Sequence, residues 1–369
     1  METSNRYLSL DVLRGITVTL MIIVNTPGNY LTTFAPLLHA KWHGFTPTDL
    51  VFPTFLFVVG NAMSFSWVKY DSVGIMAFLT KVTKRTFIIF LLGYFMYWFP
   101  FVHQQDGQWV INPLNHTRIF GVLQRIALGY FFASLILRFW KKQGAIIFTV
   151  LALLGYWVVL YFFGDYSLEH NAVLQLDLFL FGPNHLYEGD GIPFDPEGLL
   201  STIPAIVNVI AGYLTGQYIR QNGVSYESIA KLLMAGVCFL LTALAWNMIL
   251  PINKKLWTSS FTVYTIGLDL LVLPFLLYII EIKKKSRWTN FFQVFGKNTL
   301  FIYLLSEIGI VFFYLIRIGD ESLYHYLYNH LFKYVAGEYA GSLLFAVFWM
   351  LFCWSIGSWM DKRKIYIKV

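Results

Sequence analysis

Ten stretches of about twenty mostly apolar residues recur along this chain, and they constrain its fold more than any other feature. A helix needs about 20 such residues to cross the hydrocarbon core of a bilayer. Apolar residues make up 57% of the 369 positions and charged residues 13%, whereas soluble domains average roughly 45–50% and about 25%. The sequence therefore predicts an all-α, polytopic membrane helix bundle. The predicted spans are 8–26, 50–69, 84–103, 118–138, 144–163, 200–219, 231–250, 259–281, 293–316 and 340–360, with an interfacial segment at 323–336.

The distribution of basic residues predicts how the bundle is oriented. If the N-terminus is cytoplasmic, twenty of the 27 Lys and Arg residues fall on the cytoplasmic side, as the positive-inside rule requires of an N-in, C-in protein with ten helices. The net charge of +7 then reflects an anionic leaflet rather than a nucleic-acid partner. No small-residue cleavage site follows the first apolar stretch, so we expect a retained helix and not a signal peptide. No linker or internal repeat divides residues 1–369, which predicts a single transmembrane domain.

The predicted external loop at 164–199 is long and carries seven acidic residues but no Lys or Arg. Loops of this length inside compact proteins are usually functional or disordered. The loop is therefore interpreted either as a solvated acidic cover or as a lid over a substrate site. Its charge would attract a cationic acceptor such as an amino sugar.

A polar cluster precedes the second span, on the side predicted to be external. His39, His43 and Asp49 lie there, and Asn25 closes the first span on the same side. A histidine can accept a proton near neutral pH, a nearby carboxylate can orient its ring, and a side-chain amide can stabilise an oxyanion. These are the parts that acyl transfer needs, provided that the loop folds back to join His39 to Asp49. The alternative is that Asp49 only caps the second helix.

Several motifs resemble the heparan-α-glucosaminide N-acetyltransferase family, and in particular its bacterial NagX-like members. They are LSLDVLRGITVTLMIIVN at 8–25, HAKWHGFTPTDLVFPTFLFVVGNAMSFS at 39–66, RIFGVLQRIALGYF at 118–131, DPEGLLSTIPAIVNVIAGYLTG at 195–216, PINKKLWTSSFTVYTIGL at 251–268 and GKNTLFIYLLSE at 296–307. The resemblance covers nearly the whole chain. The chain starts directly at the LDVLRG helix, as the short bacterial members do, so we expect a protein of the bacterial inner membrane.

The resemblance implies an activity and a set of catalytic residues. Members of the family move an acetyl group from cytoplasmic acetyl-CoA to the amine of a terminal glucosamine across the membrane, and they need no metal. The catalytic histidine of the family corresponds to His39 in LHAKWHG, and its partners correspond to Asn25 and Asp49. The family has asparagine at the position of His43, which makes His43 a less suitable base. The family also implies a homodimer as a partner state.

Ionisable and polar groups inside predicted spans are costly and often functional. We interpret Arg14 as an anchor for the phosphates of CoA, with a structural ion pair to Asp11, three residues away, as the alternative. Arg118 and Arg125 lie two helical turns apart on one face and, with Gln124, are assigned to the donor pocket or to helix–helix hydrogen bonding. The remaining candidates for contact with acetyl-CoA or the sugar are Trp257, Ser259, Ser260 and Asn298, while Asp269 and Glu307 receive no role.

Three readings of the chain other than an N-acetyltransferase stay open. The first is an amino-sugar transporter without chemistry, although the two related halves of many transporters are not evident here. The second is a cell-envelope O-acetyltransferase, and the third is a membrane scaffold. For the enzyme, direct attack of the amine and an acetyl-His39 intermediate are both chemically sound. The sequence contains no P-loop, GxGxxG or HExxH pattern, which disfavours nucleotide and zinc hydrolysis.

Overall fold

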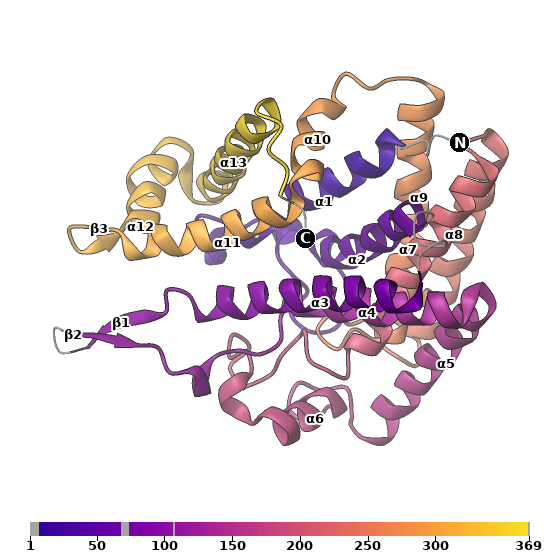
Figure 1. Cartoon of the computed structure of the whole chain (residues 1–369). Coiled ribbons are helices and arrows are strands. Elements are labelled where there is room, and N and C mark those ends of the chain that lie inside the picture. Colours follow the sequence, from indigo (N-terminus) through magenta and orange to yellow (C-terminus); the bar gives the residue numbers. More distant parts are fainter. Residues whose placement is uncertain (1–6, 68–73, 106–107, 368–369) are drawn as a thin grey trace.

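Each of the ten predicted apolar segments lies mostly in helix in the computed structural model, which describes residues 7–67, 74–105 and 108–367 (Figure 1). The predicted span 84–103 extends beyond its helix, which ends at Trp98, and positions 68–69 of the span 50–69 lie outside the described residues. The sequence therefore folds as the apolar pattern indicates. The helices are α1 (Leu8–Asn25), α2 (Pro47–Ser66), α3 (Ile75–Trp98), α4 (Val122–Phe139), α5 (Lys141–Phe162), α6 (Ala172–Phe181), α7 (Thr202–Asn222), α8 (Tyr226–Asn247), α9 (Ser259–Leu277), α10 (Thr289–Lys297), α11 (Thr299–Leu315), α12 (Leu323–Leu327) and α13 (Lys333–Lys362).

Seven helices of the described residues are long and apolar enough to cross a membrane, and the bent pair α10 and α11 provides an eighth. Two other predicted spans also form long helices but are more polar. α3 has 24 residues and carries Lys81, Lys84 and Arg85, while α7 has 21 residues and lies largely buried between other helices. A helix in the interior of a bundle needs no apolar face toward lipid. The all-α, polytopic membrane fold is confirmed.

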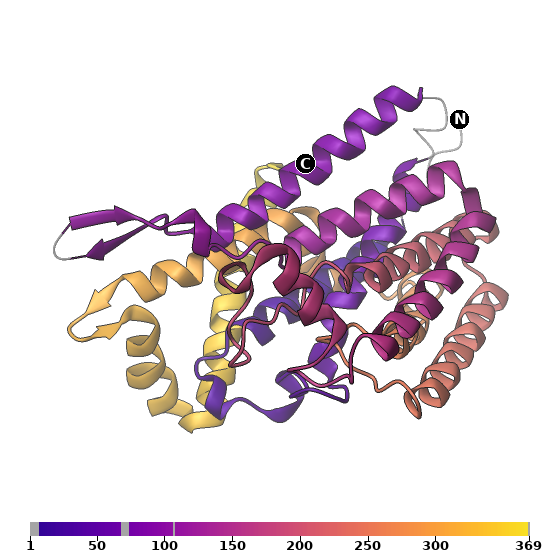
Figure 2. The ribbon, with the colours of Figure 1, turned by 90° about the horizontal axis from the view of Figure 1, so that it is seen from below.

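The centre of the bundle is the pair α2 and α7, whose backbones approach closely at two glycines. A Cβ added to Gly60 would lie 1.8 Å from the carbonyl oxygen of Val209, and one added to Gly212 would lie 1.9 Å from that of Phe57. Small residues permit this approach between membrane helices, where van der Waals packing replaces the hydrophobic driving force. α2 is therefore fixed against the bundle, and so is the site at its N-terminus. Figure 2 shows the same bundle from below.

The prediction of one continuous helix over 293–316 is wrong. α10 ends at Lys297, α11 begins at Thr299, and the two helices meet at a bend of 83°. Asn298 occupies the break, where its side chain donates to the carbonyl of Ile365 (2.9 Å) and accepts from the amide of Ile367 (3.0 Å). The bend thus holds the C-terminal segment in place. The interfacial segment at 323–336 consists of α12, a π-helical stretch and the start of α13, which is interrupted at Gly337.

Two short hairpins project from the same end of the bundle (Figures 1 and 2). Strands β1 (Val102–Gln105) and β2 (Gln108–Ile111) form one antiparallel pair, and β3 (Arg317–Ile318) and β4 (Glu321–Ser322) form the other. The sequence reading did not anticipate either of them.

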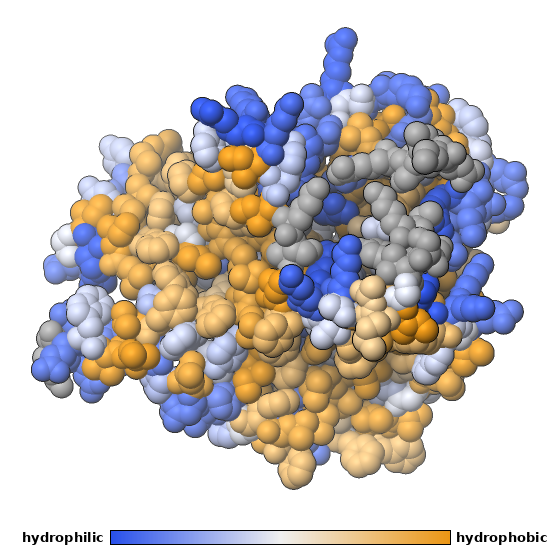
Figure 3. All heavy atoms as spheres, in the orientation of Figure 1, coloured by the Kyte–Doolittle hydropathy of each residue, from blue (hydrophilic) through white to orange (hydrophobic). Residues whose placement is uncertain are grey.

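The loops sort to the two ends of the bundle as the topology predicts. At the predicted cytoplasmic end, Ser9 donates to Glu281 (3.1 Å) and Lys297 pairs with Asp361 (2.8 Å). At the other end, the His39 loop meets the loop between α8 and α9, because the amide of Gly44 donates to the carbonyl of Ile252 (2.8 Å). Figure 3 shows hydrophobic side chains across the middle of one face and hydrophilic ones gathered toward its margins. The direction of insertion remains a prediction.

Candidate active site

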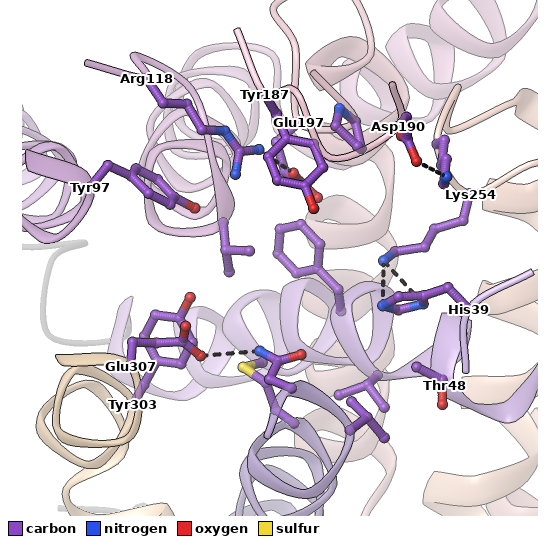
Figure 4. A pocket seen from close by; sticks show the side chains of 18 of the residues that line it. His39, Thr48, Tyr97, Arg118, Tyr187, Asp190, Glu197, Lys254, Tyr303 and Glu307 are labelled. Atoms are coloured by element: carbon purple, nitrogen blue, oxygen red, sulfur yellow. Dashed lines mark hydrogen bonds and ion pairs between the residues drawn. The ribbon is translucent and has the colours of Figure 1, made fainter. Parts of the chain in front are cut away.

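A cavity of about 400 Å³ opens where the loops meet at the end of the bundle predicted to be external (Figure 4). Apolar residues of α1, α2 and α4 form its floor, including Met21, Val51 and Val122. Its walls are polar and come from parts of the chain that are far apart in sequence. The polar lining comprises Asn25, Tyr30, His39, Thr48, Tyr97, Arg118, Tyr187, Asp190, Glu197, Lys254, Lys255, Tyr303 and Glu307.

The centre of the cavity wall is a histidine–carboxylate pair. Nδ1 of His39 lies 2.7 Å from Oδ1 of Asp49, whose side chain is fully buried. Because an ionised carboxylate only accepts hydrogen bonds, Nδ1 carries the proton and Nε2 carries the lone pair. The ring itself remains 41% exposed. The pair can therefore accept a proton from a molecule in the cavity.

The loop folds back onto the N-terminus of α2, as contact between His39 and Asp49 requires. Thr46 Oγ1 donates to the carbonyl of Leu38 (2.7 Å), and Thr48 Oγ1 donates to that of Pro36 (3.0 Å). Asp49 is also the third residue of α2, and its Oδ2 accepts from the backbone amide of Thr46 (2.9 Å). Asp49 therefore both caps α2 and contacts His39, because one carboxylate oxygen accepts from the backbone and the other faces the histidine.

A lysine distant in sequence faces the histidine. Nζ of Lys254 lies 3.2 Å from Nε2 and 3.3 Å from Nδ1 of His39 (Figure 4). The surrounding protein displaces water and lowers the pKa of His39, and the ammonium group of Lys254 lowers it further. The carboxylate of Asp49 opposes both effects. His39 is therefore biased toward its neutral form.

The opposite wall of the cavity joins Asn25 to a half-buried acid. Nδ2 of Asn25 donates to Oε1 of Glu307 across 3.1 Å. This bond fixes the orientation of the amide at the end of α1, and Tyr303 lies one helical turn before Glu307 on α11. Glu307 received no role from the sequence, and the structure makes it a partner of Asn25.

Arg118 fastens the end of the acidic loop to the bundle. Its guanidinium donates to both carboxylate oxygens of Asp195 (2.8 and 2.6 Å) and to Glu197 (2.7 Å). It also lies between the rings of Tyr97 and Tyr187, at 4.8 Å from each centroid. Although burial raises the pKa of Glu197, the charges of nearby arginines bring it below its usual value. This part of the loop is a fixed wall of the cavity, not a solvated cover.

Arg125 holds the same loop from a deeper position. It is fully buried, donates to the carbonyl of Gly198 (3.2 Å) and to Ser201, and lies over the ring of Trp257. Gln124 is also fully buried. Its side chain packs against Gly93 of α3, where an added Cβ would lie 2.5 Å from Oε1 of Gln124. Neither residue lines the cavity. Their predicted contact with the donor remains a prediction.

The other candidate residues lie around the cavity or far from it. Trp257 donates to Asn208 (3.1 Å) and packs edge-on against Phe52, which lines the cavity. Ser259 donates to the carbonyl of Leu153, and Ser260 bonds to Thr258. Three further residues form contacts away from the cavity. Arg14 donates to the carbonyl of Gly296 and pairs with Asp11. Asn298 binds the C-terminal segment, and Asp269 accepts a hydrogen bond from Thr54.

The sequence reading missed Lys254 and Lys255 as site residues. Both were counted only as basic residues on the external side, where few are expected. Lys255 forms an ion pair with Asp190 of the acidic loop, so these two lysines connect the loop to the histidine. The positive-inside rule predicts few basic residues on the external side. Two adjacent lysines there were the signal in the sequence that could have indicated a site.

Within residues 7–67, 74–105 and 108–367, no group of three or more His, Cys, Asp or Glu side chains is arranged to hold a metal ion. The two cysteines are free, and lie in different helices.

The fold and the cavity together define an integral membrane protein with a histidine–carboxylate pair at one end of its helix bundle. The family model described as "Heparan-alpha-glucosaminide N-acetyltransferase, catalytic" matches residues 6–245. The chain belongs to this family. It is similar to proteins named heparan-alpha-glucosaminide N-acetyltransferase from Mus musculus, with 26% identity over 366 residues, and from Homo sapiens, with 26% over 362. The matches cover 83% and 82% of this chain but only 54% and 53% of the relatives, so the chain spans about half of their length.

Proposed function

We propose that this protein transfers an acetyl group from cytoplasmic acetyl-CoA to the amine of glucosamine, or of a glucosamine-terminated saccharide, on the external side of the membrane. The observation that carries the proposal is the 2.7 Å contact between Nδ1 of His39 and Asp49 in the wall of the cavity. Family membership supports the reaction class. A bacterial inner membrane and a homodimer remain predictions from the resemblance.

In the direct mechanism, Nε2 of His39 accepts a proton as the amine attacks the thioester carbonyl. Asp49 stabilises the imidazolium through Nδ1. Asn25 donates to the tetrahedral oxyanion, with its amide held by Glu307. The C–S bond then breaks, the amide forms, and the thiolate of CoA leaves and takes up the proton from His39. His39 returns to its neutral form.

The donor has to cross most of the bundle to reach this position. The cavity extends inward to Met21 on α1, and from there to the cytoplasmic end of the helix at Leu8 is about 20 Å at 1.5 Å per residue. Arg14 lies on that stretch and is part-buried. We infer that the pantetheine arm follows this part of α1, with Arg14 near the phosphates.

The character of the cavity fits an amino sugar. Its volume of about 400 Å³ lies within the range of small-molecule pockets. The carboxylates of Asp190, Glu197 and Glu307 can accept hydrogen bonds from the amine and hydroxyl groups of a sugar. The tyrosines of the wall offer flat apolar surface.

The test is the release of free thiol when purified protein meets acetyl-CoA and glucosamine. We expect His39→Ala to abolish thiol release while the protein stays folded, because it removes the only base in contact with Asp49. His43→Ala is the matched control: this ring is exposed, lies in the same loop and contacts Asn253 at 3.3 Å. Near wild-type thiol release by His39→Ala would remove His39 from the mechanism.

The same assay separates the alternatives. A transporter would carry glucosamine into vesicles without releasing thiol. An O-acetyltransferase would yield an ester, which hydroxylamine cleaves, whereas the amide product resists it. Labelled acetyl-CoA without acceptor tests the two enzyme routes, since label bound to His39 supports an acetyl-histidine intermediate and its absence supports direct transfer.

A further inference from the structure

Lys254 occupies an unusual position relative to the base. Its Nζ is almost equally far from the two ring nitrogens of His39, at 3.2 Å from Nε2 and 3.3 Å from Nδ1. A donor in line with the Nε2 lone pair would be much nearer to one nitrogen than to the other. The ammonium group therefore faces the ring and not one nitrogen alone, as Figure 4 also shows.

The other charges that face His39 are negative. Asp49 contacts the ring from the first turn of α2, and Glu197 faces it from the acidic loop. Both carboxylates favour the imidazolium form, in which the histidine can no longer accept a proton. Lys254, from the loop between α8 and α9, supplies a cation that opposes these two carboxylates at the ring.

The loop that carries Lys254 is held rigidly. The side chain of Asn253 accepts from the amide of Leu256 (2.8 Å), and Thr258 Oγ1 accepts from the amide of Asn253 (3.1 Å). Gly44 of the histidine loop donates to Ile252 (2.8 Å), which ties the two loops together. Lys255 points to a different partner, Asp190. The two adjacent lysines therefore have separate tasks.

We propose that Lys254 is a positioning residue that acts through His39: its charge keeps the ring neutral beside two carboxylates, so that the base is ready when the acceptor amine arrives. This inference deepens the proposed function and rests on it for its effect on the reaction rate. The pKa of Lys254 lies below its usual value, because burial and the charges of Arg125 and Lys255 outweigh the carboxylates of Glu197 and Asp49, which favour the ammonium form. The group needs no contact with the substrate to have this effect.

The test measures the protonation of His39 without relying on activity. Diethyl pyrocarbonate modifies neutral imidazole, and mass spectrometry of the peptide that contains His39 gives the rate of modification at each pH. Removal of a unit charge about 3 Å away shifts such a midpoint by about one pH unit, even with the screening of water. In Lys254→Gln, and in the longer neutral variant Lys254→Met, we expect the midpoint to rise by at least about that amount.

Two variants serve as controls. Lys254→Arg keeps the charge, and Lys255→Gln removes a neighbouring charge that is paired with Asp190, so both should stay much closer to the wild-type midpoint. Thermal unfolding in detergent verifies that each variant is folded. If the midpoint in Lys254→Gln and Lys254→Met equals that of the wild type, the inference is overturned.

The acid limb of kcat/KM for thiol release should move upward with the same midpoint. If the midpoint moves but the wild type releases no thiol, control of His39 by Lys254 is supported and the proposed function fails. If thiol release is normal and the midpoint does not move, the proposed function stands and the role of Lys254 is refuted.

Discussion

The exchange of Asp49 for asparagine tests the site most directly, because the two side chains have the same shape. The carboxylate accepts hydrogen bonds on both oxygens. Oδ1 accepts from His39 (2.7 Å), while Oδ2 accepts from the backbone amides of Ala40 (3.1 Å) and Thr46 (2.9 Å). An asparagine has only one carbonyl oxygen, so one of the two sets of donors must face its NH₂ group.

The structure indicates which set loses its acceptor. If the NH₂ group of Asp49→Asn faced the backbone, the amides of Ala40 and Thr46 would both lack a partner, at a cost of about 1–3 kcal/mol each. The favoured arrangement therefore turns the NH₂ group toward His39. Nδ1 then has to accept, the proton moves to Nε2, and the base is lost. In a serine-protease triad the corresponding change lowers kcat by about 10⁴-fold.

We therefore expect Asp49→Asn to lower kcat for thiol release by about 10³- to 10⁴-fold, with a loss of only about 1–3 kcal/mol in unfolding free energy from the weakened hydrogen bonds. The measurements are initial rates of thiol release at saturating acetyl-CoA and thermal unfolding in detergent. If the variant is folded and its kcat lies within tenfold of wild type, the proton does not pass through a histidine oriented by Asp49, and the reasoning fails.

Two further predictions concern the acidic loop. Arg118→Lys keeps the charge but loses the paired hydrogen bonds to Asp195 and the contacts with two tyrosine rings. Because each charged hydrogen bond contributes about 1.5–3 kcal/mol, KM for glucosamine in the thiol-release assay should rise at least about tenfold. An unchanged KM would mean that this wall does not shape the acceptor site. Burial raises the pKa of Asp177, in the short helix of the same loop, to about 7. Since the folded value exceeds the unfolded one, this group favours folding below about pH 4, and its contribution is lost as the pH rises to about 7. Asp177→Asn should therefore unfold at a higher temperature than wild type at pH 8, and the gap should nearly close at about pH 4; an equal gap at both pH values would contradict this.

The bilayer explains why so much of the fold could be predicted from the sequence. A helix that crosses it has to be long and apolar, and that requirement appears directly as runs of residues. The bend at Asn298 has no such signal, since no proline marks it, and it depends on contact with the C-terminal residues near Ile365. α7 shows the opposite case, because its position inside the bundle tolerates polar residues that a lipid-facing helix would avoid.

The site could be predicted only where it is local in sequence. His39 and Asp49 lie ten residues apart, and the turn between them is set by the start of α2. Lys254 reaches the same ring from 215 residues away, and Glu197 comes from a third loop. Such contacts depend on how helices far apart in the chain pack, for which one sequence gives no pattern. The charges of these loops were visible, but their partners were not.

The way in which the site is fastened favours chemistry over transport. A carrier has to rearrange around its substrate to expose the site alternately to the two sides. Here one oxygen of Asp49 caps α2, and Arg118 and Arg125 fix the acidic loop at Asp195 and Gly198. Opening the external wall would break these buried hydrogen bonds together. Group transfer, in contrast, gains its rate from reacting groups held in one geometry. The same contacts that would hinder a carrier are therefore those that an acyltransferase needs.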